Sequence, residues 1–266
     1  MKFSNKVVLI TGGGSGIGRA AALGFAQRGA TVVVVDRDET ATRDTAEMVR
    51  KEGVQALHLV ADVSQSAQVR AYVEATLDAF GRIDCFFNNA GIEGTVGPLA
   101  EYDEDVFDQV LAVNMRGVFL GLRHVLPVML KQGAGAVVNT SSTAGLVASP
   151  GMCAYVASKH AVLGLTKVAA GEVSGNGVRV NAVCPGPIDT RMLRDIAAQV
   201  SPDDPEAVQH GFVSSVPIGR AGTAEEVANV VLFLCSDLAS NVTGAHYMVD
   251  GGRLASPKGV TSVPEK

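Results

Sequence analysis

The feature that most constrains this chain is a glycine-rich turn between a buried strand and a helix near its N-terminus. Residues 7–10 (Val-Val-Leu-Ile) form an apolar run without polar alternation, which is typical of a strand buried on both faces. Residues 11–18 (Thr-Gly-Gly-Gly-Ser-Gly-Ile-Gly) follow, and residues 19–26 are mostly small and apolar, as in a packed helix. Glycines let a backbone approach a pyrophosphate, whose charge the helix N-terminus stabilises. This order of elements predicts a dinucleotide-binding start to an α/β fold.

A second apolar run, residues 32–35, ends in the acidic residue Asp36. Asp36 lies 18 residues after Gly18 (36 − 18 = 18), close to the spacing of roughly 20 for the acid that binds the adenosine ribose. Its carboxylate would accept hydrogen bonds from ribose hydroxyls and repel a 2′-phosphate, which favours NAD over NADP. Arg37 leaves NADP open, because a guanidinium could offset the repulsion or bind the phosphate.

Strand-like and helix-like segments alternate along the rest of the chain. The further apolar runs are residues 57–60, 83–87, 136–139, 178–183 and 246–249, and the helical segments are residues 42–52, 66–80, 105–130, 154–173 and 224–234. This alternation predicts parallel βαβ units with right-handed crossovers and helices on both faces. We therefore expect an α/β fold, one doubly wound Rossmann domain of about seven parallel strands over residues 1–252.

Two segments depart from the alternation. Residues 190–216 form a long insertion that contains two prolines and several large apolar side chains. Such an insertion is a lid, a binding loop or disorder, and we predict a substrate lid. Residues 253–266 show no periodicity, so we predict a flexible tail.

The composition excludes several classes of partner. The 266 residues carry 22 Lys and Arg against 27 Asp and Glu, a net charge of −5 that argues against nucleic acid or an anionic membrane. No apolar stretch approaches the roughly 20 residues that span a bilayer, and no secretory signal precedes the first strand. The four scattered cysteines lack a Cys-x-x-Cys pattern, which indicates reduced thiols in the cytoplasm and no metal site.

Tyr155 and Lys159 point to proton-transfer chemistry. Their spacing of four places a phenol and an ammonium on the same face of a helix. A nearby cation lowers the pKa of a phenol from about 10, so that the tyrosine can exchange a proton with a substrate oxygen. Ser142 lies 13 residues earlier (155 − 142 = 13), just after a predicted strand. All three are thus expected at the edge of the sheet where ligands bind.

With these residues in view, the chain resembles the short-chain dehydrogenase/reductase family from Lys6 to about Gly252. The matching motifs are the turn 11–18, Asp62-Val63 as an adenine contact, Asn88-Asn89-Ala90-Gly91 beside the cofactor, Asn114 in a helix, Ser142 with Tyr155 and Lys159, and residues 185–190 as the segment that binds the nicotinamide carboxamide. Ser141 is the residue that we expect to cap the turn that follows the strand. Asn88 is expected to be structural.

The resemblance implies a catalytic mechanism and a cofactor site. Tyr155 acts as the general acid/base, Ser142 binds the same substrate oxygen, and Lys159 lowers the Tyr155 pKa and binds ribose hydroxyls. Asn114 would hold a water of a proton relay, with a purely structural helix-kink asparagine as the alternative. The expected cofactor contacts are Gly12, Ser15, Gly16, Ile17, Gly18, Asp36, Arg37, Asp62, Val63, Asn89, Ala90, Gly91, Tyr155, Lys159, Pro185, Gly186, Ile188 and Thr190.

Residues 91–94 and 117–121 look like those of family members that act on cyclic secondary alcohols, diols and diketones. Glu93 would accept a hydrogen bond from a second substrate hydroxyl, or is a solvated loop carboxylate. The candidate substrate residues are Glu93, Ser142, Met152, Pro187, Met192, Leu193 and Phe212. The function predicted is an NAD-dependent alcohol/ketone oxidoreductase, by resemblance a homotetramer. A 3-oxoacyl-thioester reductase and a non-catalytic dinucleotide sensor are the alternatives.

Overall fold

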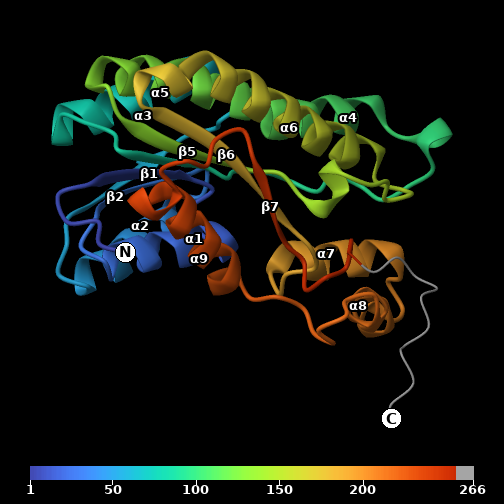
Figure 1. Ribbon diagram of the computed structural model, residues 1–266. Helices are drawn as coiled ribbons and strands as arrows, with labels where there is room; N and C mark the ends of the chain where they lie inside the picture. Colours follow the sequence, from blue (N-terminus) through green and yellow to red (C-terminus); the bar gives the residue numbers. More distant parts are fainter. Residues whose placement is uncertain (256–266) are drawn as a thin grey trace, which may run out of the picture.

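The computed structural model describes residues 1–255, and its centre is a seven-stranded parallel sheet in the order β3-β2-β1-β4-β5-β6-β7 (Figure 1). The strands are β1 (Val7–Thr11), β2 (Thr31–Asp36), β3 (Ala56–Val60), β4 (Cys85–Asn88), β5 (Gly135–Thr140), β6 (Val178–Pro185) and β7 (His246–Val249). The strand order reverses between β1 and β4, and such a switch point opens a crevice at the carboxyl ends of the strands. The doubly wound fold predicted from the sequence is confirmed.

Helices cover both faces of the sheet (Figure 1). They are α1 (Gly16–Ala26), α2 (Glu39–Lys51), α3 (Ser66–Phe80), α4 (Glu104–Leu111), α5 (Gly117–Gln132), α6 (Cys153–Val173), α7 (Arg191–Val200), α8 (Pro205–Ser214) and α9 (Ala224–Cys235). Alternate residues of β1 enter separate cores, because side chains of a strand point to opposite faces. Val8 and Ile10 pack with α1 and α9, whereas Val7 and Leu9 pack with α3, α5 and α6.

One predicted helix is interrupted. The sequence predicted a single helix over residues 105–130, but a π-helical turn at Ala112–Arg116 separates α4 from α5. The turn lies where the side chain of Asn114 exchanges two hydrogen bonds of 2.8 Å with the backbone of Ile92. A π turn widens the helix without ending it, so the apolar pattern runs through it unbroken.

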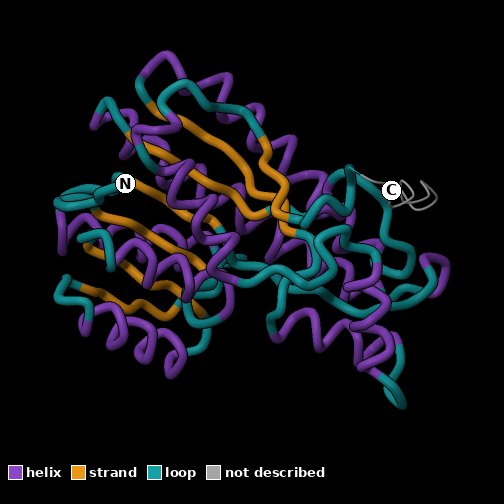
Figure 2. Tube along the Cα trace, turned by 60° about the horizontal axis from the view of Figure 1, so that its bottom comes forward, coloured by secondary structure: helices purple, strands orange, loops and turns teal. Residues whose placement is uncertain are grey.

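The segment over residues 190–216 is folded. It forms α7 and α8, which pack against each other beside the carboxyl ends of the strands (Figures 1 and 2). The lid interpretation stays a proposal, and disorder is wrong for this segment. At the start of the predicted tail, Arg253 and Ala255 donate backbone hydrogen bonds to Asp250 and Gly252 in a turn. Residues 256–266 lie outside the described residues.

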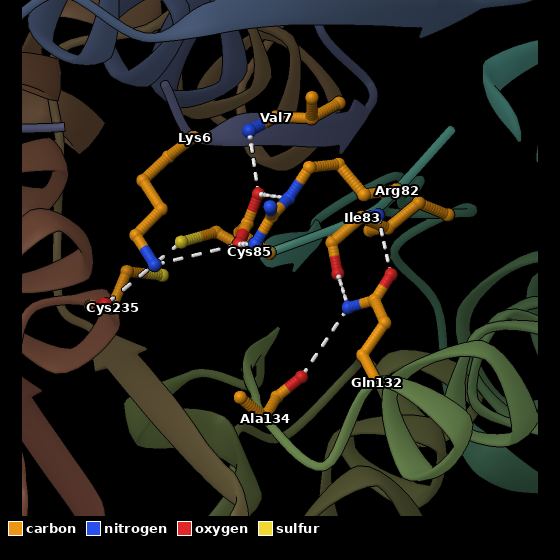
Figure 3. A network of polar contacts seen from close by, with 9 residues as sticks. Lys6, Val7, Arg82, Ile83, Cys85, Gln132, Ala134 and Cys235 are labelled. Carbon is orange, nitrogen blue, oxygen red and sulfur yellow. Dashed lines mark hydrogen bonds and ion pairs between the residues drawn. The ribbon is translucent and has the colours of Figure 1, made fainter. Parts of the chain in front are cut away.

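A polar network holds the amino ends of β1 and β4 together (Figure 3). The crevice lies at the other ends of these strands. Asp84, which is 7% exposed, accepts hydrogen bonds from the backbone of Val7 and from Arg82, and pairs with Lys6. Gln132 bonds both the N–H and the carbonyl of Ile83. These contacts hold the two strands in place, and their side chains do not line the cavity in the crevice.

Candidate active site

The crevice contains a cavity of about 930 Å³. It is lined by residues from the glycine turn, the ends of β2, β4, β5 and β6, the start of α6, and α7. Seventeen of the eighteen expected cofactor contacts lie in this lining, and the exception is Gly18. Ser142 and the apolar substrate candidates Met152, Pro187, Met192, Leu193 and Phe212 also line it. The structure therefore brings the two sets of residues into one space.

The glycine turn leaves room for a backbone-bound anion. Gly12 and Gly16 have φ angles of +64° and +49°, a region that side-chain-bearing residues rarely adopt. Gly18 lies beneath the turn, where a Cβ would come within 2.0 Å of the Gly12 carbonyl oxygen. Gly18 thus allows the close packing of α1 on β1. This position beneath the turn explains why Gly18 does not line the cavity. The first turn of α1 has no acidic residue and its N-cap, Ser15, makes no side-chain cap, so its N–H groups can receive a pyrophosphate.

Asp36 is oriented at the far end of the cavity. Its carboxylate accepts hydrogen bonds from Gly14 N at 3.0 Å and Asp38 N at 3.2 Å. Each carboxylate oxygen keeps a further lone pair for a ligand hydroxyl. Asp62 is held in the same way, since its side chain accepts the Ser64 N–H at 2.8 Å. Together with the glycine turn, these residues fit a dinucleotide.

Lys159 is 3% exposed, and its ammonium donates to the Thr140 carbonyl at 2.9 Å. It lies 5.4 Å from the centre of the Tyr155 ring. Burial lowers the pKa of Lys159 to about 8. Burial acts in the opposite direction on Tyr155, whose charged form is the phenolate, and raises its pKa above the ordinary value. A hydrogen bond from the nearby Ser142 hydroxyl only partly opposes this rise. The expectation of a lowered Tyr155 pKa is therefore wrong for the protein alone, because desolvation penalises phenolate and ammonium alike.

The two serines after β5 differ from expectation in which of them caps the following turn. Ser142, not Ser141, caps the short turn at Thr143–Gly145, since its Oγ accepts the Ala144 N–H at 3.1 Å. Ser141 donates instead to the carbonyl of Lys159 at 2.8 Å, which fixes α6 on the end of β5. The cap also restricts the Ser142 hydroxyl to one place on the cavity wall, which suits a group that must bind a substrate oxygen.

Asn114 is fully buried and does not line the cavity. Its two amide hydrogens go to the Ile92 carbonyl at 2.8 Å and the Ser158 hydroxyl at 3.1 Å. The side chain thus joins the π turn to the loop after β4, and a role in a water relay stays a proposal. Asn88 donates to Val118 O and to Asn139 Oδ1, both buried, in line with the structural role expected of it.

Glu93 is also absent from the cavity lining, although its charge is close enough to raise the Tyr155 pKa. Sequence reasoning missed several lining residues, among them Thr143, Ser149 and Arg253. The two hydroxyls lie in a segment without a motif, and Arg253 falls in the stretch predicted as a tail. The only available signal was the position of residues 143–149 between Ser142 and Tyr155.

Comparison with known proteins decides the family. A family model described as "Enoyl-(Acyl carrier protein) reductase" matches residues 12–253. The chain is a short-chain dehydrogenase/reductase. This short-chain dehydrogenase/reductase is 45% identical to levodione reductase of Leifsonia aquatica over 96% of each chain. It is 42% identical to cyclohexanol dehydrogenase of Acinetobacter sp. (strain SE19), over 94% of this chain and 95% of that one.

Further comparisons give one more relative by sequence and two similar solved structures. The 3-oxoacyl-[acyl-carrier-protein] reductase FabG of Thermotoga maritima is 41% identical over 95% of this chain and 99% of that one. The crystal structure of levodione reductase superposes with a TM-score of 0.95 at 44% identity, covering 96% of this chain and 100% of that one. NAD+-bound xylitol dehydrogenase gives a TM-score of 0.90 at 37% identity, covering 95% and 100%. The chain is thus an oxidoreductase of this family.

Two further observations concern the described residues alone. Among residues 1–255, no helix has the length and apolar character needed to cross a bilayer. Within the same range, no three His, Cys, Asp or Glu side chains gather in a way that could hold a metal ion.

Proposed function

We propose that this protein is an NAD-dependent oxidoreductase that interconverts a secondary, cyclic alcohol and its ketone, with Tyr155 as general acid/base. The observation that carries the proposal is that Ser142, Tyr155 and Lys159 share one cavity with the glycine turn and Asp36. The activities named for levodione reductase and cyclohexanol dehydrogenase support a cyclic substrate. The apolar walls that Met192, Leu193 and Phe212 would present suit a small ring.

A bound nicotinamide dinucleotide would exchange a hydride with the carbon that bears the substrate oxygen. Tyr155 gives a proton to that oxygen in ketone reduction and takes it in alcohol oxidation. Like any phenol, Tyr155 is protonated at neutral pH, and burial raises its pKa further, so the protein alone is poised to donate. Lys159, with a pKa of about 8, is the neighbouring group that can restore the proton. Ser142 holds the substrate oxygen by a hydrogen bond, which also stabilises developing negative charge.

The preference for NAD rests on Asp36. Its carboxylate is held by Gly14 N and Asp38 N, so a 2′-phosphate at the same ribose would meet a fixed negative charge. Arg37 lines the same end of the cavity. Its guanidinium could pair with a 2′-phosphate, which limits the preference for NAD over NADP. Asp36→Ala should narrow the ratio of kcat/KM for NAD over NADP; a wild-type enzyme that already prefers NADP would contradict the assignment.

The test of the reaction is direct. Enzyme, NAD and a panel of cyclic secondary alcohols are mixed, and NADH formation is followed by absorbance. Tyr155→Phe should reduce turnover by about 10²- to 10⁴-fold, the range for a positioned acid/base, while NADH binding measured by fluorescence persists. Undiminished turnover in this variant would reject the role of Tyr155. Absence of turnover by the wild-type enzyme across the panel, with tight NADH binding, would favour a dinucleotide sensor.

A 3-oxoacyl-thioester reductase is the second candidate, because FabG of Thermotoga maritima is nearly as similar to this chain as the alcohol dehydrogenases are. Reduction of a 3-oxoacyl thioester with NADPH, faster than any cyclic ketone with NADH, would favour it. The resemblance also supports a homotetramer, the scattered cysteines support a cytoplasmic location, and the insertion at residues 190–216 supports a substrate lid. Light scattering of the purified protein tests the first of these, and limited proteolysis of residues 190–216 with and without NADH tests the lid.

A further inference from the structure

A second cavity of about 540 Å³ adjoins the active-site cavity against helix α8. We call it the side chamber, and its lining consists of Thr143, Val147, Ser149, Val208, Gly211, Phe212, Ser215, Arg253 and Leu254. Four of these residues, Thr143, Ser149, Phe212 and Arg253, also line the cavity that contains Tyr155. The side chamber and the cavity that contains Tyr155 are therefore neighbours that share these four wall residues.

Among the described residues, Arg253 is the one charged residue that lines the side chamber. Three arginines in nearby segments are each paired with a carboxylate: Arg191 with Asp195, Arg194 with Asp189, and Arg220 with Glu226. Within residues 1–255, the guanidinium of Arg253 forms no ion pair and no side-chain hydrogen bond. A guanidinium in this setting can bind a carboxylate through two parallel N–H donors.

Two hydroxyls share the wall with Arg253. The side chains of Thr143 and Ser149 form no hydrogen bond with any other described residue, whereas the third hydroxyl, of Ser215, is satisfied by the Phe212 carbonyl at 2.6 Å. The wall thus offers a cation and two hydroxyl donors, and none of the described residues that line it is acidic. Val147, Val208, Phe212 and Leu254 supply apolar surface around these groups.

The backbone that carries Arg253 is ordered by a turn of its own. Asp250, which is 9% exposed, accepts the N–H of Gly252 at 2.9 Å and of Leu254 at 3.0 Å. Gly251 and Gly252 have φ angles of +61° and +88°, which allow the chain to reverse tightly after β7. Arg253 N also donates to the Asp250 carbonyl at 3.2 Å. The position of Arg253 at the chamber is therefore set by local structure.

We propose that the side chamber binds an anionic group of the substrate, so that the preferred substrate is an alicyclic hydroxy or oxo acid. Its carboxylate pairs with Arg253 and accepts hydrogen bonds from Thr143 or Ser149. Its ring lies against the apolar surface between the chamber and Tyr155. This assignment rests on the proposed function and adds to it the charge of the substrate.

The test compares 4-hydroxycyclohexanecarboxylate with its carboxamide, which has nearly the same shape without the charge. With wild-type enzyme and NAD, kcat/KM for the acid should exceed that for the amide by about 10- to 100-fold, as expected for hydrogen bonds to a charged group. Arg253→Gln should bring this ratio to near one by raising KM for the acid, and Arg253→Lys should retain part of it. Arg43→Gln, which removes the same charge from an exposed site on α2, should keep the wild-type ratio.

Binding provides a readout that does not depend on turnover. The affinity of cyclohexanecarboxylate and of cyclohexanecarboxamide for the protein with NADH is measured by calorimetry, for wild type and Arg253→Gln. A tenfold preference for the acid that is lost in the variant supports the chamber even if no alcohol is oxidised. Equal affinity of the wild-type protein for the two compounds would overturn the proposal. An equal loss of affinity for both compounds in Arg253→Gln would overturn it as well. If the wild-type enzyme oxidises both alcohols with a ratio of kcat/KM for acid over amide near one, the side chamber does not bind an anionic group. The proposed function would still stand.

Discussion

Lys159 should make the stability of this protein depend on pH in a way that one substitution removes. The ammonium is buried, and this lowers its pKa from the ordinary value of 10.5 to about 8. One pKa unit corresponds to about 1.36 kcal/mol, so the charged lysine destabilises the folded state by roughly 3 kcal/mol below pH 8. Lys159→Met retains an unbranched apolar side chain at this position and removes the titration.

The sign follows from proton uptake. Between pH 8 and pH 10.5 the lysine is neutral in the folded protein and protonated in the unfolded chain, so unfolding takes up a proton and wild-type stability rises with pH. The unfolding free energy of wild type minus that of Lys159→Met should therefore increase by about 2 kcal/mol from pH 7 to pH 9.5. The lost hydrogen bond to Thr140 O adds an offset that does not depend on pH.

The measurement is urea denaturation of both proteins without cofactor at pH 7.0, 8.0, 8.75 and 9.5. Burial also raises the pKa of Cys184 to about 11, and raises that of Tyr155, but these groups are present in both proteins and cancel in the difference to first order. Parallel stability curves for the two proteins would refute the reasoning. They would show that Lys159 keeps an ordinary pKa, and that its environment is more polar than the structure indicates.

Other predictions follow from single groups. The Tyr72 hydroxyl is buried with no hydrogen-bond partner among the described residues, so Tyr72→Phe should raise the unfolding free energy by about 1 kcal/mol; a loss would reveal a hidden partner. Gly18→Ala should abolish NADH binding in a fluorescence titration, because its Cβ would meet the Gly12 carbonyl at 2.0 Å. Gly171→Ala, on α6 with no atom within 4 Å of the new Cβ, is the matched control and should bind normally. Asn88→Ala should lower the urea midpoint and cost about 2 to 3 kcal/mol, since it removes two buried hydrogen bonds; a cost below 0.5 kcal/mol would contradict the structural role.

The sheet could be predicted because its strands are short apolar runs. Four consecutive buried valines in β2 leave little alternative to a strand covered on both faces, and the turn before α1 sets the first crossover. The π turn at Ala112–Arg116 could not be predicted in this way, since it leaves the apolar face of the helix intact. Its position depends on a contact between Asn114 and Ile92, which are 22 residues apart.

The candidate site also has features that the sequence predicted and features that it did not. The residue types at 142, 155 and 159 predicted a shared location, and all three line one cavity. The pKa directions could not be derived from spacing, because they depend on how many protein atoms surround Tyr155 and Lys159. Arg253 was missed for a related reason: its place at the cavity depends on the turn after β7, which brings residues distant in the chain against α8.

The anchor between β5 and α6 has a further consequence. Ser141 binds the main-chain carbonyl of Lys159, while the amine of Lys159 binds the main-chain carbonyl of Thr140. The first of these contacts does not involve the side chain at 159, so it remains available when Lys159 is replaced by another unbranched residue. A change of basicity at 159 can therefore be tested for its effect on the proposed reaction while the contact between Ser141 and the main chain of α6 is kept.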